Sequence, residues 1–181
     1  MSLNDLSCLH SLASLQERLP MLGQQVCDRV ESLELEQPVL ALTVLNGGLI
    51  FSGMLLPYLS FELTCDYIHA SRYRGEVSAS DDLQWFAKPS QSMEGRCVLL
   101  LDDIFDEGIT LKTLVDFCYE QGACKVITVC LADKQLNDEA KRQQRPNVLD
   151  FSLVKIPDVF VVGLGMDYQG LYRNKPGIFQ C

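Results

Sequence analysis

Three short apolar segments, each followed at once by polar or glycine residues, limit most strongly what this chain can fold into. They read PVLALTVLNGG (38–48), RCVLLLDD (96–103) and KVITVCLAD (125–133). Segments with so few polar positions are typical of strands buried on both faces, which occur in parallel sheets covered by helices. Residues 110–123, between the last two segments, carry apolar side chains at helical spacing. This alternation predicts an α/β domain with a mainly parallel sheet flanked by helices.

Weaker patterns predict the remaining elements. Leucine and valine recur at steps of three or four through residues 3–35, which predicts a helical segment interrupted near Pro20. A second helix is expected over residues 49–59. Residues 71–82 are polar and contain glycine and serine, so we expect a mobile loop there. Alternating or dense apolar residues predict further strands at residues 61–70, 83–89 and 160–167.

Length and composition exclude several classes of protein. The 181 residues suit one domain, and the formal net charge of −9 with no basic stripe argues against a nucleic-acid partner. No apolar run approaches the roughly 18 residues that a membrane span needs. The eight cysteines form no C-x-x-C pair, so we expect reduced thiols, mostly in the core, and a cytoplasmic protein with no secretory signal.

Polar groups follow four of the expected strands, at Asn46-Gly47-Gly48, Asp102-Asp103, Asp133-Lys134 and Asp167. In open α/β sheets, ligands bind beyond the carboxyl ends of the strands. If these strands are neighbours, one crevice collects all four groups. That crevice is the predicted functional site.

The segment VLLLDDIFDEGIT (98–110) places four carboxylates within six positions, just after a buried strand. Gly108 and Thr110 follow where a loop becomes a helix, and backbone N–H groups at a helix N-terminus bind phosphate. Asp102 and Asp103 could accept hydrogen bonds from sugar hydroxyls beside that phosphate and bind Mg²⁺ through oxygen ligands. The alternative is purely structural: a strand, an acidic turn and an N-capped helix.

The longer string VLLLDDIFDEGITL resembles the signature of the type I phosphoribosyltransferases. LNGG (45–48) and IPDVFVVGLGMDYQGLYR (156–173) resemble the diphosphate loop and the purine-binding segment of the hypoxanthine-guanine branch. The resemblance covers roughly residues 38–175. It implies a single domain, 1–181, with an N-terminal helical segment (1–35), a lid loop (71–82), a purine-binding segment (150–181), and a small hood built from terminal segments.

The resemblance also implies roles for individual residues. Asp106 would be the catalytic acid/base near purine N7, and Mg²⁺ would be held by Asp102, Asp103 and Asp167. Purine binding would fall to Lys134, Phe160, Val161 and Asp167. Phosphoribosyl diphosphate and nucleotide would be bound by Asn46, Gly47, Gly48, Tyr73, Asp102, Asp103, Asp106, Glu107, Gly108, Ile109, Thr110 and Arg173.

The implied function is purine salvage: transfer of 5-phosphoribosyl from phosphoribosyl diphosphate to N9 of hypoxanthine or guanine, which forms IMP or GMP and diphosphate. The implied assembly is a homodimer or homotetramer. Two alternatives stay open. One is a phosphoribosyltransferase that prefers xanthine. The other is a non-catalytic relative of the same fold that senses nucleotides or binds RNA.

Three positions depart from the family pattern. Asn46 stands where the diphosphate loop usually has lysine, in a loop whose preceding peptide bond is often cis. Arg72-Tyr73 replaces the usual Ser-Tyr of the lid. Glu107 follows the catalytic aspartate where threonine or serine is usual. A carboxylate beside a phosphate is unfavourable, so we expect Glu107 to point away or to bind a metal ion.

Overall fold

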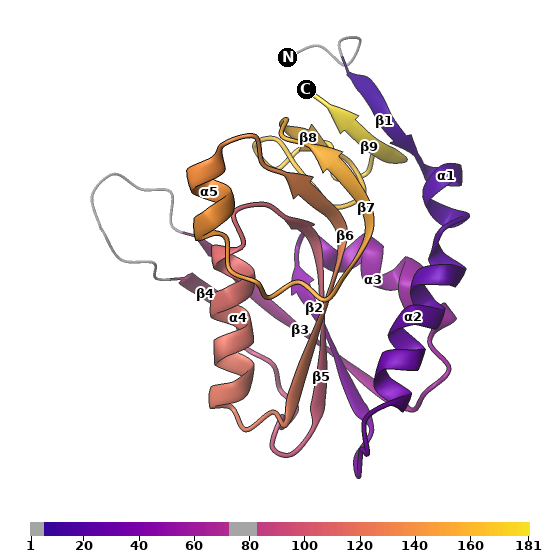
Figure 1. Ribbon diagram of the computed structural model, residues 1–181, viewed down its shortest axis with the longest axis vertical. Coiled ribbons are helices and arrows are strands. Elements are labelled where there is room, and N and C mark those ends of the chain that lie inside the picture. The colour runs from indigo at the N-terminus through magenta and orange to yellow at the C-terminus, as the bar shows by residue number, and fades with distance from the viewer. Residues whose placement is uncertain (1–5, 73–82) are drawn as a thin grey trace.

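The computed structural model describes residues 6–72 and 83–181 (Figure 1). Two sheets form: a six-stranded sheet in the order β4-β3-β2-β5-β6-β7, and a three-stranded sheet in the order β1-β9-β8. The strands are β1 Ser7–Ser11, β2 Val39–Leu45, β3 Leu63–Arg72, β4 Leu83–Ala87, β5 Cys97–Phe105, β6 Lys125–Gln135, β7 Phe151–Pro157, β8 Val161–Val162 and β9 Gly177–Gln180. The helices are α1 Leu12–Gln16, α2 Leu19–Glu31, α3 Gly48–Leu55, the 3-10 helix η2 Leu56–Tyr58, α4 Ile109–Glu120 and α5 Glu139–Gln144.

The larger sheet confirms the predicted α/β architecture. The three dense apolar segments form β2, β5 and β6, which are adjacent and parallel. Side chains alternate between the two faces of β5: Leu99 and Leu101 join one core cluster, and Val98 and Leu100 join the other. Figure 1 shows α2 and α3 on one side of this sheet and α4 on the other. The segments are apolar throughout because both faces of each strand are covered.

The N-terminal segment is only partly helical, so the prediction of one helical stripe from residue 3 was wrong at its start. Residues 7–11 form β1, which pairs antiparallel with β9. The Ser11 side chain then accepts a hydrogen bond from the N–H of Ser14 and caps α1. The expected interruption near Pro20 is confirmed, because α2 begins at Leu19 with proline in its first turn.

The three-stranded sheet is the predicted hood, built from both terminal segments. Its strand β8 is much shorter than the predicted strand at 160–167, because the chain turns directly after Val162. Gly163, Leu164 and Gly165 all have positive φ, which ends the extended conformation. The hood therefore folds back over the larger sheet instead of extending it.

Several other boundaries differ from the predictions. The helix expected at residues 49–59 is divided into α3 and η2, with Pro57 inside the 3-10 turn. The strand at 83–89 is confirmed as β4, which pairs antiparallel with β3 at the sheet edge. Strand β7 and helix α5 were not predicted. The predicted lid starts in β3, which extends to Arg72, and residues 73–82 lie outside the described residues.

The amino ends of the parallel strands are joined by Arg96, a largely buried side chain. Its guanidinium donates to the backbone carbonyl of Pro38 (3.0 Å), the carbonyl of Val39 (3.3 Å) and the Thr64 hydroxyl (2.5 Å). It also donates to the side-chain oxygen of Gln91 (3.2 Å). Arg96 thus links β2, β3 and the entry to β5 at the end of the sheet opposite the predicted crevice.

All eight cysteines are free, as expected. Four of them are in the core, namely Cys27, Cys97, Cys118 and Cys130. The expectation of mostly buried thiols was too broad, since Cys8, Cys65 and Cys124 are exposed. None of the helices in the described part of the chain has the length and apolar character that a membrane span requires.

Candidate active site at the carboxyl ends of the strands

A pocket of about 1110 Å³ lies where β2, β5 and β6 end and the hood approaches them. The predicted crevice is therefore present among the described residues. Gly48 lies just behind it, buried at the start of α3, and Tyr73 is outside the described residues. The predicted residues that line the pocket are Asn46, Gly47, Asp102, Asp103, Asp106, Glu107, Gly108, Ile109, Thr110, Lys134, Phe160, Val161, Asp167 and Arg173.

The loop after β2 is packed so tightly that only glycine fits at its centre. The Leu45–Asn46 peptide bond is cis. A Cβ atom on Gly47 would lie 2.0 Å from a carboxylate oxygen of Asp103. A Cβ atom on Gly165, in the hood, would lie 1.8 Å from the carbonyl oxygen of Gly47. The loop is thus held between the end of β5 and the purine-binding segment.

Asp102 and Asp103 bring two carboxylates to the end of β5. The Asp102 side chain accepts a hydrogen bond from the N–H of Asp103 (2.8 Å), and Asp103 accepts one from the N–H of Ile104 (2.7 Å). Burial raises the pKa of Asp102 well above its ordinary range, and the charge of Asp103 raises it further. Burial also raises the pKa of Asp103, although hydrogen bonds and the charge of Arg173 act in the opposite direction.

This pair fits a divalent cation. Asp102 is buried and directly precedes a second carboxylate, Asp103, and Mg²⁺ prefers such oxygen ligands. Within residues 6–72 and 83–181, no group of three or more His, Cys, Asp or Glu side chains could hold a metal alone. Such a site suits Mg²⁺, which commonly binds one or two carboxylates and takes its other ligands from substrate phosphates and water.

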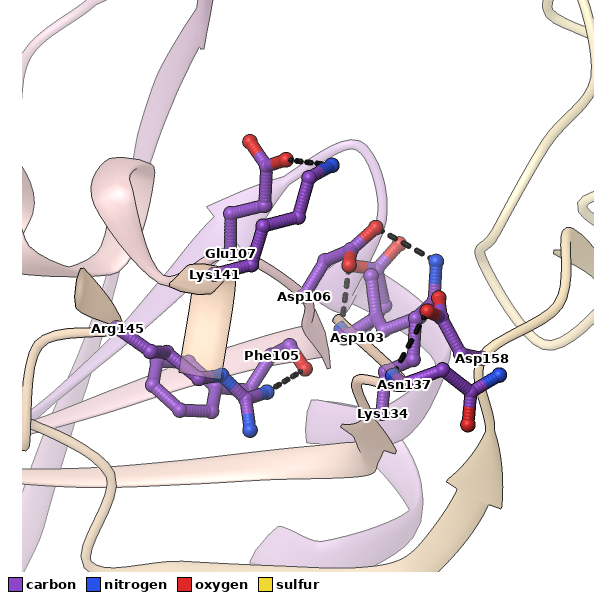
Figure 2. Close-up of polar contacts among 10 residues, drawn as sticks. Asp103, Phe105, Asp106, Glu107, Lys134, Asn137, Lys141, Arg145 and Asp158 are labelled. Atoms are coloured by element: carbon purple, nitrogen blue, oxygen red, sulfur yellow. Dashed lines mark hydrogen bonds and ion pairs between the residues drawn. The ribbon is translucent and has the colours of Figure 1, made fainter. Parts of the chain in front are cut away.

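An ion pair joins the ends of β5 and β6. The Nζ atom of Lys134 lies 2.6 Å from a carboxylate oxygen of Asp106 (Figure 2). The lysine side chain is only 10% exposed and the aspartate side chain 47% exposed. A nearly buried ammonium needs a partner, and Asp106 supplies it. The predicted catalytic residue and one of the predicted purine-binding residues are therefore in direct contact.

The segment after Asp106 is shaped to bind an anion. Gly108 adopts φ +80° and precedes α4, whose first N–H groups have no partner within the helix. A Cβ atom at Gly108 would lie 2.6 Å from the Phe105 ring, so a side chain has no room there. The N–H groups of Ile109 and Thr110 belong to this first turn, which is a favourable place for a phosphate.

Glu107 makes an ion pair that the sequence did not predict. One of its carboxylate oxygens lies 2.8 Å from Nζ of Lys141, on α5 (Figure 2). Glu107 also lines the pocket. The sequence suggested an outward orientation or a metal ion for this carboxylate, and the structure places a lysine beside it instead.

The hood lines one side of the pocket with two of the predicted purine-binding residues, Phe160 and Val161. The Phe160 ring is 47% exposed and packs edge-on against Tyr168, with 5.8 Å between ring centroids. Val161 is buried and pairs with Gln180 in β9. The exposed Phe160 ring therefore lies at the edge of the cavity, directly before the short strand β8.

Asp167 and Arg173 contact each other at the same side of the pocket. Their closest oxygen and nitrogen lie 2.7 Å apart, and Asp167 also accepts a hydrogen bond from the N–H of Gly170 (2.6 Å). Arg173 further donates to the carbonyl oxygen of Gly165. Metal binding by Asp167 and diphosphate binding by Arg173 stay predictions.

Sequence reasoning missed three ring-bearing residues of the pocket, namely His69, Phe105 and Tyr168. His69 lies in register with Leu45 near the carboxyl end of β3, so the rule that found the other strand ends could have found it. Tyr168 contacts Phe160, but no local signal marks it as a neighbour of that ring.

Comparisons with known proteins agree with this geometry. The phosphoribosyl transferase domain family matches residues 25–169. The hypoxanthine-guanine phosphoribosyltransferase of Bacillus subtilis is 34% identical over 139 residues, which cover 77% of this chain and 74% of the relative. The Staphylococcus aureus Mu50 enzyme of the same name is 30% identical over 142 residues, or 78% and 76% of the two chains.

Solved structures extend the similarity to nearly the whole chain. A crystal structure of a Staphylococcus aureus hypoxanthine phosphoribosyltransferase has a TM-score of 0.84 at 29% identity, covering 98% of this chain and 92% of that one. The Trypanosoma cruzi hypoxanthine phosphoribosyltransferase in complex with the product IMP has a TM-score of 0.84 at 25% identity, covering 97% and 93%.

Fold, pocket and similarity together show that the chain belongs to the phosphoribosyltransferase family. Its relatives are those of the hypoxanthine-guanine branch of the type I enzymes.

Proposed function

We propose that the protein transfers the 5-phosphoribosyl group of phosphoribosyl diphosphate to N9 of hypoxanthine or guanine, forming IMP or GMP and releasing diphosphate. The observation that carries this proposal is the Lys134–Asp106 pair, 2.6 Å apart, in a pocket shared with Asp102 and Asp103. Residues that could bind a purine, transfer its proton and bind a ribose therefore line one cavity.

The sugar and its phosphates would bind along the main sheet. The first turn of α4 would hold the 5′-phosphate through Gly108–Thr110. Asp102 and Asp103 would accept hydrogen bonds from the ribose hydroxyls and hold Mg²⁺. When bound, Mg²⁺ neutralises charge on the diphosphate leaving group. The Asn46–Gly48 loop and Arg173 would bind that diphosphate from the opposite side.

The reaction would proceed through charge separation at the ribose. The bond from C1′ to the diphosphate oxygen breaks, positive charge develops on the ribose, and purine N9 forms the new bond to C1′. Carboxylates near the sugar would stabilise the positive charge, and Asp106 would accept the proton that leaves N7 as N9 bonds to C1′. Exclusion of water would be the role of the 71–82 lid with Tyr73, most of which lies outside the described residues.

The purine would bind between the hood and the end of β6. Phe160 would stack on the base, and the backbone of Val161 would contact its edge. Asp167 would lie close to the exocyclic group. Lys134 would donate to the 6-oxo group, which selects against adenine because a 6-amino group offers a second donor where an acceptor is needed.

A spectrophotometric assay tests the proposal. The purified protein would be supplied with phosphoribosyl diphosphate, Mg²⁺ and one base at a time: hypoxanthine, guanine, xanthine or adenine. We expect turnover with hypoxanthine and guanine and none with adenine. Turnover with xanthine alone would support the xanthine-preferring alternative. Binding of phosphoribosyl diphosphate without turnover of any base would support a non-catalytic relative.

We also propose that the protein acts in the cytoplasm as a homodimer or homotetramer. Light scattering on the purified protein would measure the assembled mass, and a monomer at micromolar concentration would contradict this part of the proposal.

A further inference from the structure

Glu107 places a negative charge on the loop that would bind the 5′-phosphate. It directly precedes Gly108, lines the pocket, and its side chain is 40% exposed. A phosphate is a dianion near neutral pH, and like charges a few ångströms apart repel even in a high dielectric. The loop therefore needs a feature that offsets this carboxylate before it can hold phosphate well.

Lys141 supplies a positive charge at that carboxylate. The two residues are 34 positions apart in the chain, and Lys141 reaches Glu107 from α5 (Figure 2). Hydrogen bonding to Glu107 and its charge raise the pKa of Lys141, so the amine is ionised wherever the enzyme works. The side chains are 54% and 40% exposed, and exposed pairs contribute little to folding. Folding stability is thus a weak explanation for the contact.

The amino end of α5 is fixed by its own contacts. The Asp138 side chain accepts a hydrogen bond from the N–H of Lys141 at 3.0 Å and caps the helix. The N–H of Asn137 donates to the Asp158 carboxylate at 3.0 Å, which ties the segment to the chain that follows β7 (Figure 2). Lys141 therefore approaches Glu107 from an anchored backbone.

The carboxyl end of α5 is attached to the phosphate loop itself. Arg145 donates to the carbonyl oxygen of Phe105 and forms an ion pair with Asp133 at 2.9 Å. Its guanidinium lies 3.8 Å from the centre of the Phe105 ring. That ring occupies the space beside Gly108. The short segment of α5 and Arg145 is thus linked to Glu107 through Lys141 and to Phe105 through Arg145.

We propose that Lys141 is a positioning residue for 5′-phosphate binding: it neutralises Glu107 and keeps the carboxylate from repelling the substrate phosphate. The inference rests on the proposed function, because it takes the ligand of the α4 N-terminus to be a ribose 5′-phosphate. Lys141 acts through Glu107, so its effect should depend on whether residue 107 carries a charge.

Calorimetric titration with IMP and with inosine tests this, since the two ligands differ only in the phosphate. The variants are Lys141→Met, Glu107→Gln and the double variant. Arg142→Met is the matched control, because Arg142 is on the same helix, is 56% exposed, and pairs with Glu139 at 3.9 Å instead of with the loop. Both methionine variants remove one positive charge from α5.

We expect Lys141→Met to weaken IMP binding roughly three- to tenfold, the size of one close charge interaction in a screened site. Inosine binding should not change. Glu107→Gln should bind IMP at least as tightly as the wild type, the double variant should recover most of the loss, and Arg142→Met should match the wild type.

Equal weakening of IMP and inosine by Lys141→Met would indicate a general structural defect and overturn the inference. So would a double variant as weak as Lys141→Met, or a loss of the same size in Arg142→Met. The titration needs no turnover, so wild-type protein that binds IMP but makes no nucleotide would refute the proposed function and leave this inference intact.

Discussion

Replacing Gly165 with alanine tests whether contact between the hood and the diphosphate loop sets the shape of the pocket. A Cβ atom there would lie 1.8 Å from the carbonyl oxygen of Gly47 and 2.8 Å from its carbonyl carbon. An ordinary contact is about 3.5 Å, so the two segments would have to separate by roughly 1.5 Å. The φ of +108° adds backbone strain, which typically costs about 1–3 kcal/mol.

The displacement should matter more for activity than for folding. A misplacement of about 1 Å in reacting groups can cost roughly 100-fold in rate, so we expect kcat/KM to fall about 100-fold. Gly170→Ala is the control, because Gly170 has φ +81° and nothing within 4 Å of an added Cβ. It carries similar strain without the collision. We expect it to lose some thermal stability but to keep kcat/KM within about threefold of the wild type.

The two variants would be compared by steady-state kinetics with hypoxanthine and by thermal denaturation. A folded Gly165→Ala protein with the activity of Gly170→Ala would refute the reasoning, since the contact with Gly47 would then have no part in shaping the pocket.

Three further outcomes are expected. Asp106→Asn should lower kcat by at least about 100-fold, measured by rapid-quench kinetics, and change the Kd for phosphoribosyl diphosphate by no more than about threefold, measured by calorimetry. A similar loss in kcat and in affinity would argue against an acid/base role. Burial raises the pKa of Asp102, so the folded state binds the carboxyl proton of this residue more tightly than the unfolded state does. The folded state therefore loses stability as the pH rises and this proton is released. Asp102→Asn, without Mg²⁺, should therefore melt above the wild type at pH 7, with the gap closing towards pH 4; a gap that widens in acid would contradict the sign. Phe160→Leu should raise KM for hypoxanthine about tenfold and leave KM for phosphoribosyl diphosphate unchanged, because only base stacking is lost; a matching rise in both would place Phe160 outside the base site.

The parts of the fold that sequence predicted well are those whose signal is local and dense. β2, β5 and β6 were found because unbroken apolar segments occur where both faces of a strand are covered. β1 was missed because Leu9 continues the spacing of the leucines in the helix that follows, and its strand conformation depends on pairing with β9 at the other end of the chain. Helix α5 was missed because it has no buried residue and is defined by the Asp138 cap and by tertiary contacts.

The difference between local signals and signals that depend on tertiary contacts also applies to the site. The crevice was predictable because parallel strands end at one edge, and the order β2-β5-β6 brings their polar ends together. The contact between Lys141 and Glu107 was not predictable, because Lys141 lies on α5, a helix without a buried residue to mark it in the sequence. The sequence marked Glu107 as a departure from the family pattern, and only the folded arrangement showed that Lys141 lies beside it.

The Arg96 cluster has a practical consequence. It closes the amino ends of β2, β3 and β5 through Pro38, Val39 and Thr64, whereas the pocket lies at the carboxyl ends. Hydrogen bonds that join three strands thus lie at one end of the sheet and the pocket lies at the other. A substitution at Arg96 that leaves the protein folded should therefore lower the melting temperature and have little effect on turnover.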